Sequence, residues 1–262
     1  WALSMWVKPD MVPKGAETIS NGNNLTFWSA GDGGANGGYT DFCYLQAQDT
    51  TNFDIRWHMS AASSGVANKT TTRKFRDPSA WYHFVFVWDT TNSTATDRMR
   101  LYVNGERETS FSATTDPAIS TPSYLMNVAN QDQMIGNYSY FNDPYYSNGQ
   151  FPANSYIAEV NFIDGTALGP ESFGQTDAAT NQWKPVEYTG SYGSNGFYQK
   201  YSATELAASF TDSATGRPIN SYGDVHTDTA VKKIGTASAQ FDGAGDDYLS
   251  VIGCSDWVVA SN

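Results

Sequence analysis

The clearest alternation of side-chain types lies between Ala80 and Glu106. In its first run, residues 81–88, large apolar side chains occupy both sets of alternate positions. Because successive side chains of a strand point to opposite faces, this run is expected to be a central strand that is covered on both sides. In the second run, Met99, Leu101 and Val103 alternate with more polar residues, which predicts a strand with one buried face.

Asn104-Gly105 ends this second run, and both residues tolerate the positive φ that a type I′ turn requires. Other alternating runs predict further strands over residues 1–8, 24–30, 41–48, 52–59, 133–136 and 156–163. Residues 60–73 read as a polar link, and residues 111–122 read as a loop. Something must cover the face that carries Tyr82, Phe84, Phe86 and Trp88, and the segment from Gly174 onward is the expected cover.

Composition supports an all-β fold. The 262 residues include 23 Gly, 16 Tyr, 14 Phe and 8 Trp, and short aromatic-rich runs alternate with Gly, Asn, Ser and Thr. The pattern contains no long helical stretch. The length suffices for one large sandwich with a full core.

Charge narrows the function classes. The formal net charge is −12, which argues against binding to nucleic acids or anionic membranes, because both require clustered Lys and Arg. No apolar run reaches the roughly 18 residues that a membrane helix needs, so membrane insertion is not expected. Two cysteines are too few for a disulfide framework or for a zinc site made of cysteines.

The central hairpin resembles a known superfamily. The order Trp81-Tyr82-His83, an apolar strand, Asp89, a polar turn and the run from Leu101 to Gly105 is similar to the central hairpin of laminin-G-like, concanavalin-A-like jelly rolls. The resemblance implies an all-β, two-sheet antiparallel jelly-roll sandwich. It implies no single function, because that superfamily includes lectins, adhesive modules, glycosidases and virion proteins.

The same resemblance suggests three parts of the chain. Residues 1–174 correspond to a sandwich that lacks its leading strands, and residues 175–224 form an extension that packs on it. Within residues 225–262, Phe241-Asp-Gly and Asp247-Tyr-Leu resemble the missing leading strands. We therefore expect residues 241–251 to pair with strands of residues 1–200, in the same chain or in a neighbouring copy. The alternative is that residues 225–262 begin a second module.

Residues 174–198, which follow the strand AEVNFIDG, resemble laminin-G-like proteins of tailed bacteriophages, particularly marine and cyanobacterial ones. This likeness implies a virion surface protein, either a tail-fibre or spike adhesin or a capsid decoration protein. The implied partners are other virion subunits, further copies of this chain and host surface glycans. Two other functions stay open: a polysaccharide-degrading glycoside hydrolase of the same fold, and a secreted bacterial carbohydrate-binding adhesive module.

A tyrosine-rich loop over residues 137–152 is the candidate glycan site. Flat aromatic rings beside amides and carboxylates suit the apolar C–H faces and the hydroxyl groups of sugars. An alternative is that the tyrosines pack the loop onto the sandwich or form a subunit interface. The candidate glycan-binding residues are Asn137, Tyr138, Tyr140, Asn142, Asp143, Tyr145 and Tyr146.

Calcium is the only ion that the pattern suggests, and no other cofactor is expected. Asp32, Asn36 and Asp41 flank a glycine-rich loop and offer oxygen ligands, as do Asn142 and Asp143. The alternative is that these residues only form turns, where Asp and Asn are common for backbone reasons.

Catalysis is not expected. The Glu-x-Asp-x-x-Glu pattern of laminarinase-like enzymes is absent, and Glu159 and Asp164 have the wrong spacing to share one strand face. The superfamily resemblance makes His83 a structural histidine in the core or in a hydrogen-bond network. A serine–histidine–aspartate arrangement stays open, although no Gly-x-Ser-x-Gly occurs.

Overall fold

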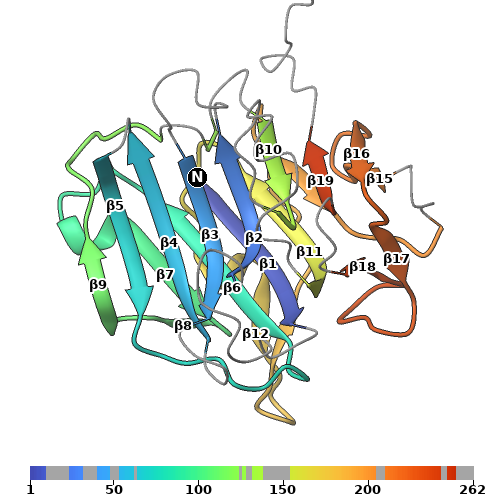
Figure 1. The fold of residues 1–262 in the computed structure, drawn as a ribbon. Helices are drawn as coiled ribbons and strands as arrows, with labels where there is room; N and C mark the ends of the chain where they lie inside the picture. Colours follow the sequence, from blue (N-terminus) through green and yellow to red (C-terminus); the bar gives the residue numbers. More distant parts are fainter. Residues whose placement is uncertain are drawn as a thin grey trace, which may run out of the picture.

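The computed structural model describes residues 1–9, 24–31, 40–47, 53–61, 64–123, 126–127, 132–137, 154–204, 210–242 and 247–251. They form two large sheets, and every strand pairing among them is antiparallel, which confirms the predicted two-sheet sandwich (Figure 1). Helix is limited here to two 3-10 turns, η1 (Ala95–Asp97) and η2 (Pro170–Ser172). Neither of them, nor any other helix in these ranges, is long and apolar enough to cross a membrane.

The first large sheet, sheet A, has eight strands. Strand β14 (Phe197–Gln199) adds to one end of β11, on the edge that β18 also uses. The other seven strands of sheet A follow the order β17 (His226–Asp228), β18 (Ser238–Phe241), β11 (Ser155–Ile163), β1 (Ala2–Pro9), β6 (Tyr82–Trp88), β7 (Met99–Val103) and β8 (Glu106–Arg107). Outside both large sheets, β12 (Gly174–Thr176) and β13 (Trp183–Pro185) form a separate two-stranded hairpin.

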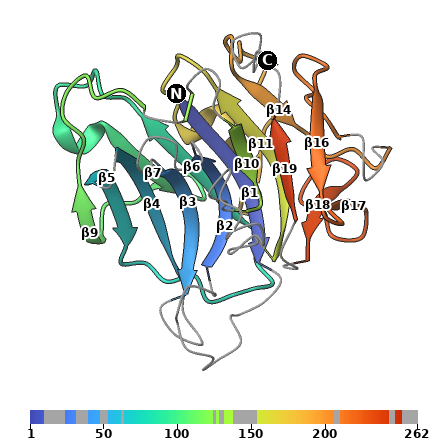
Figure 2. The same cartoon turned by 45° about the horizontal axis from the view of Figure 1, so that its top comes forward.

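The second large sheet, sheet B, has nine strands. Figures 1 and 2 place its C-terminal strands at one end of the sandwich and β9 at the other. The strand order is β15 (Phe210–Thr211), β16 (Pro218–Tyr222), β19 (Tyr248–Val251), β10 (Asp132–Ile135), β2 (Asn24–Gly31), β3 (Thr40–Ala47), β4 (Phe53–Ala61), β5 (Ser64–Thr71) and β9 (Phe111–Thr115).

The central hairpin forms as the pattern predicts. β6 pairs with β1 on one side and with β7 on the other, so it lies inside sheet A. Asn104 and Gly105 have φ values of 50° and 84°, and they connect β7 to β8 with both residues in the left-handed region. This is the conformation that a type I′ turn requires.

The main core fills the space between the two sheets. Rings from sheet A meet rings from sheet B, with centroid distances of 5.7 Å for Phe84 and Phe27 and 5.3 Å for Phe86 and Trp57. Trp1 contacts Trp28 across the same space at 6.2 Å. Complete burial of each such side chain contributes roughly 1.5–3 kcal/mol, so these aromatic layers hold the sheets together.

The expected position of the C-terminal extension is wrong in one respect. Sheet B, and not the extension, covers the face of β6 that carries Phe84, Phe86 and Trp88. The segment after Gly174 lies on the opposite face, where Tyr188 and Tyr192 pack on a second apolar cluster. The alternating pattern showed that both faces of β6 need covers. It could not show which cover each face receives, because both faces are apolar. The cluster consists of Ala2, Val85, Val87, Ile163 and Phe173.

The strands near the C-terminus complete both sheets within the same chain. In sheet A, Phe241 of β18 lies opposite Ser155 of β11. In sheet B, Val251 of β19 lies opposite Gln133 of β10. The prediction that residues 241–251 pair with strands of residues 1–200 is therefore confirmed for these positions.

Two segments that were predicted as loops are strands. β5 pairs with β4 and β9, and β9 forms the last strand of sheet B. The inward positions of β5 are Ala67, Lys69 and Thr71, all of them buried, and only one of the three is apolar. Because two of these three buried positions are polar, β5 lacks the hydrophobic alternation that marks a strand in a sequence. Backbone pairing with β4 and β9 holds it in the sheet.

Candidate functional site

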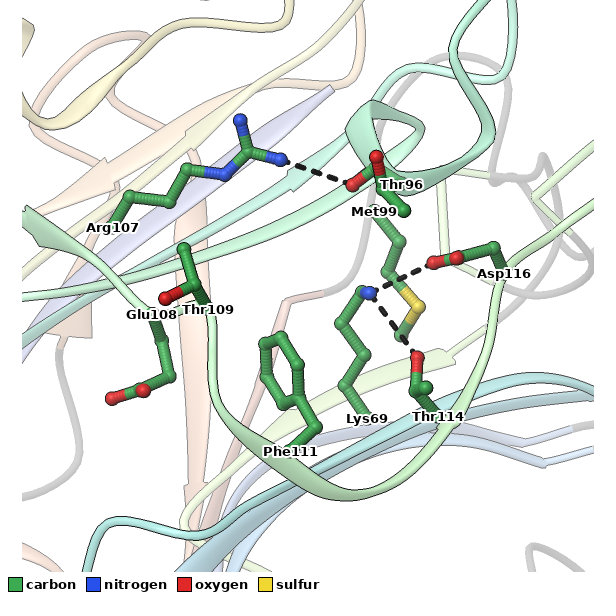
Figure 3. A pocket seen from close by; sticks show the side chains of 9 residues that line it. All are labelled: Lys69, Thr96, Met99, Arg107, Glu108, Thr109, Phe111, Thr114 and Asp116. Carbon is green, nitrogen blue, oxygen red and sulfur yellow. Dashed lines mark hydrogen bonds and ion pairs between the residues drawn. The ribbon is translucent and has the colours of Figure 1, made fainter.

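A cavity of about 330 Å³ opens between the edges of the two sheets, at the end of the sandwich that carries β9 (Figure 3). Sheet B contributes β5 and β9, and sheet A contributes β7 and β8 together with the short turn η1. The lining residues are Lys69, Thr96, Met99, Arg107, Glu108, Thr109, Phe111, Thr114 and Asp116.

Lys69 lies in the wall of this cavity, with only 3% of its surface exposed. It shares one face of β5 with the buried residues Ala67 and Thr71, so its side chain is directed between the sheets, and it lies opposite Thr114 of β9. Its Nζ donates hydrogen bonds to Oδ1 of Asp116 at 2.8 Å and to Oγ1 of Thr114 at 3.3 Å, as Figure 3 shows. The ammonium group also lies 4.6 Å from the centroid of the Phe111 ring. These contacts compensate for the loss of hydration of a buried cation.

The other charged groups of the cavity are also paired. Arg107 donates to the backbone oxygen of Thr96 at 3.1 Å and forms an ion pair with Asp97. Glu108 is buried, and its Oε2 lies 2.8 Å from Nε of Arg73. Two cations and two carboxylates therefore line the cavity, and each has a partner of opposite charge within the protein.

The remaining lining groups are apolar or uncharged. Phe111 is half-buried and supplies the accessible apolar wall, and the fully buried Met99 closes the inner side. The hydroxyl groups of Thr96, Thr109 and Thr114 belong to exposed residues and lie at the rim. A concave site with apolar walls and a few placed polar groups is typical of small-ligand binding sites.

Sequence reasoning assigned none of these lining residues to a functional site. The one sequence signal for the cavity is Lys69, a single charged residue within a short run of uncharged residues. That signal is interpretable only once β5 and β9 are recognised as strands.

Most of the predicted glycan residues lie outside the described part of the chain, namely Tyr138, Tyr140, Asn142, Asp143, Tyr145 and Tyr146. Asn137 is described, and only 2% of its surface is exposed. Its backbone oxygen accepts a hydrogen bond from Oγ of Ser29 at 2.9 Å, which fixes the start of that loop against β2. The grouping of these residues into a glycan site therefore stays a prediction.

The predicted calcium ligands Asp32 and Asn36 also lie outside the described part of the chain. Asp41 lies in β3, and its side chain is not among the described ones.

A cluster of three aspartates lies near the C-terminal strands, where side-chain oxygens of Asp224, Asp242 and Asp247 all lie within 4.8 Å of one another. The two oxygens of Asp247 accept backbone N–H groups from Asp224 at 2.9 Å and from Asp242 at 3.1 Å. Burial raises the pKa of the Asp247 carboxyl to about 6. Calcium takes about six to eight oxygen ligands, so these three side chains make an incomplete set within the described ranges. We assign Asp247 to holding the backbone at Asp224 and Asp242.

His83 has the hydrogen-bonding role predicted for it. The indole N–H of Trp183 donates to Nδ1 of His83 at 2.9 Å, so that nitrogen carries no proton. In the neutral ring the proton is then on Nε2, which donates to Oγ of Ser4 at 2.8 Å. Burial lowers the pKa of His83 to about 3. A histidine in this tautomer cannot accept the serine proton, so this pair lacks the arrangement of a catalytic serine and its base.

Glu159 and Asp164 have separate structural partners. Glu159 accepts a hydrogen bond from the hydroxyl of Tyr198, and burial raises the pKa of its carboxyl. Asp164 accepts hydrogen bonds from Nδ2 of Asn127 at 2.6 Å and from the backbone N–H of Asn195 at 3.1 Å. Glu159 thus holds β14 against β11, and Asp164 fixes neighbouring segments at the end of β11.

A family model described as the concanavalin A-like lectin/glucanases superfamily matches residues 1–168, well over half of the chain. The match covers the strands from β1 to β11 and all nine residues that line the cavity. A comparison with curated proteins found no match, and a comparison with solved structures found none either. The chain belongs to the concanavalin A-like lectin/glucanase superfamily.

Proposed function

We propose that this chain is a non-enzymatic, carbohydrate-binding surface protein of a tailed-phage virion, either a tail-fibre or spike adhesin or a capsid decoration protein. Superfamily membership fits a carbohydrate-binding or adhesive module. The observation that carries the proposal is the cavity between the sheet edges, which combines an apolar wall with hydroxyl groups at its rim. Sugars present both apolar C–H groups and hydroxyl groups, so they match both parts of this lining.

The state of the carboxylates supports binding without hydrolysis. A glycosidase needs one carboxyl as the acid and a second as nucleophile or base, about 5–5.5 Å or 6.5–9.5 Å apart. Glu108 is engaged by Arg73, and Asp116 is engaged by Lys69. Both carboxylates are thus engaged with cations of the protein, which favours a binding role for the cavity.

The virion assignment rests on the resemblance of residues 174–198 to tailed-phage proteins and is supported by how that segment packs. Phe173 contacts Tyr188, with ring centroids 5.5 Å apart, and Tyr188 contacts Tyr192 at 5.2 Å. The segment thereby seals the outer face of sheet A, as expected for a rigid scaffold on an exposed particle. A net charge of −12 fits a protein that acts away from nucleic acid. We propose other virion subunits and further copies of this chain as its partners.

The proposal is tested on particles and on polysaccharides. Antibodies against the chain should label the outer surface of virions of the phage that encodes it. The purified chain should retain host polysaccharide on a column and release no new reducing ends from it. Release of reducing ends would replace the proposal with a glycoside hydrolase. Absence from virions, with secretion by a bacterium, would replace it with a bacterial adhesive module.

A further inference from the structure

We propose that the cavity between β5, β9 and β7 takes one uncharged sugar unit and rejects sugars that carry a carboxylate or an amine. The sugar class rests on the proposed function. The selection for an uncharged ligand follows from the ion pairs that line the cavity.

The size of the cavity limits the ligand to one unit. At about 330 Å³ it is near the lower end of the range of about 300–1,000 Å³ that is usual for small-molecule sites. Buried Met99 and nearly buried Lys69 close its inner side, and exposed threonines surround its mouth. A pyranose ring can place its C–H groups against the half-buried Phe111 ring while its hydroxyl groups meet Thr96, Thr109 or Thr114.

An anionic ligand would have to compete with the protein's own carboxylates. Lys69 already donates to Asp116 at 2.8 Å, and Arg107 is paired with Asp97. If a ligand carboxylate displaced Asp116, the aspartate would be left without its cation in a partly buried position. If it did not displace Asp116, it would be desolvated beside two carboxylates, since Glu108 also lines the cavity. Both outcomes disfavour binding of the anion.

A cationic ligand meets the same difficulty with opposite sign. Its ammonium group would approach Lys69 and Arg107, and the carboxylates that could accept it are held by Lys69 and Arg73. The cavity therefore offers threonine hydroxyl groups and ion-paired carboxylates as hydrogen-bonding partners. An uncharged polyol can use them without breaking an ion pair of the protein.

The test is a titration of the full chain, labelled with ¹⁵N, with methyl glycosides of neutral hexoses and with the uronic acid and amino sugar of the same ring stereochemistry. A neutral glycoside should shift the backbone amide signals of Thr109, Phe111 and Thr114. The matching uronate and amino sugar should bind at least about tenfold more weakly, which corresponds to about 1.4 kcal/mol. Raising the salt concentration should leave the affinity for the neutral glycoside unchanged, because no net charge is neutralised.

Two variants locate the site. Phe111→Leu keeps an apolar side chain against the core but removes the aromatic ring, and it should weaken binding about tenfold. Tyr222→Leu, an exposed aromatic of β16 at the other end of sheet B, is the matched control and should bind as the unchanged chain does. Thr109→Val gives a second reading at the rim in case Phe111→Leu lowers stability.

The outcomes distinguish a failure of the selectivity for uncharged sugars from a failure of carbohydrate binding itself. If a uronate or amino sugar binds more tightly than its neutral parent, or if a bound sugar shifts signals only outside the cavity, the inference is overturned while carbohydrate binding stands. If no sugar or host polysaccharide binds at all, both are overturned.

Discussion

The indole N–H of Trp183 donates a hydrogen bond to Nδ1 of His83 across 2.9 Å, although the two residues lie 100 positions apart in sequence. The two rings are also nearly parallel, with centroids 6.0 Å apart. This contact joins the β12–β13 hairpin to the outer face of sheet A. It also sets the tautomer of His83, which then donates to Ser4.

Trp183→Phe should lower the free energy of unfolding by about 1–3 kcal/mol, because it leaves the buried Nδ1 of His83 without its donor. Denaturant unfolding followed by circular dichroism measures this change. Tyr222→Phe, a substitution at an exposed ring, is the control. Equal stability of Trp183→Phe and the unchanged chain would show that the hydrogen bond does not hold the hairpin.

The depressed pKa of His83 predicts a loss of stability in acid. The folded-state pKa is about 3, and the ordinary value is 6.5, so the folded state binds fewer protons than the unfolded state between these values. The stabilising contribution is therefore complete above pH 6.5 and is lost as the pH falls toward 3. The free energy of unfolding should fall less steeply between pH 7 and 4 in His83→Gln than in the unchanged chain. Identical slopes would contradict a buried neutral His83, as would a ring that titrates near pH 6.5 by NMR.

Two glycines with similar backbone conformation separate the packing of Trp183 on Gly105 from the cost of backbone strain. Gly105 and Gly165 have similar φ values of 84° and 75°, but a Cβ on Gly105 would lie 2.6 Å from the Trp183 ring, whereas one on Gly165 would meet nothing within 4 Å. Gly165→Ala should cost about 1–2 kcal/mol, from the left-handed backbone alone. Gly105→Ala should cost clearly more, because the indole must also move. Thermal unfolding of both variants measures the difference, and equal costs would mean that Trp183 does not rest on Gly105.

The role assigned to Asp247 predicts its titration. Burial and the neighbouring carboxylates raise its pKa to about 6, so the folded state binds more protons than the unfolded state between about pH 4 and 6. Its contribution to stability is greatest at low pH and is lost as the pH rises through 6. The side-chain carboxyl signal of Asp247 should titrate near pH 6 with or without added calcium. A midpoint that falls when calcium is added would show that the cluster binds the ion, contrary to our assignment.

The sequence was informative where large apolar side chains alternate. Strands such as β6 and β11 could be predicted because their faces are filled by Phe, Trp, Val and Ile, and so could the turn at Asn104-Gly105. β5 and β9 could not be predicted, because Lys69 and the threonines around it are held by pairing between strands and by an ion pair. Those two strands form one wall of the cavity, so the candidate site was missed with them. The predicted aromatic glycan loop and calcium ligands stay predictions.

Binding to a glycan array tests the central claim most directly, with the unchanged chain, Phe111→Leu and Tyr222→Leu compared at equal concentration. We predict that the unchanged chain and Tyr222→Leu bind the same set of glycans, that these glycans carry uncharged terminal sugars, and that Phe111→Leu loses most of the signal. Retention of full binding by Phe111→Leu, or the absence of any binding by the unchanged chain, would contradict the account.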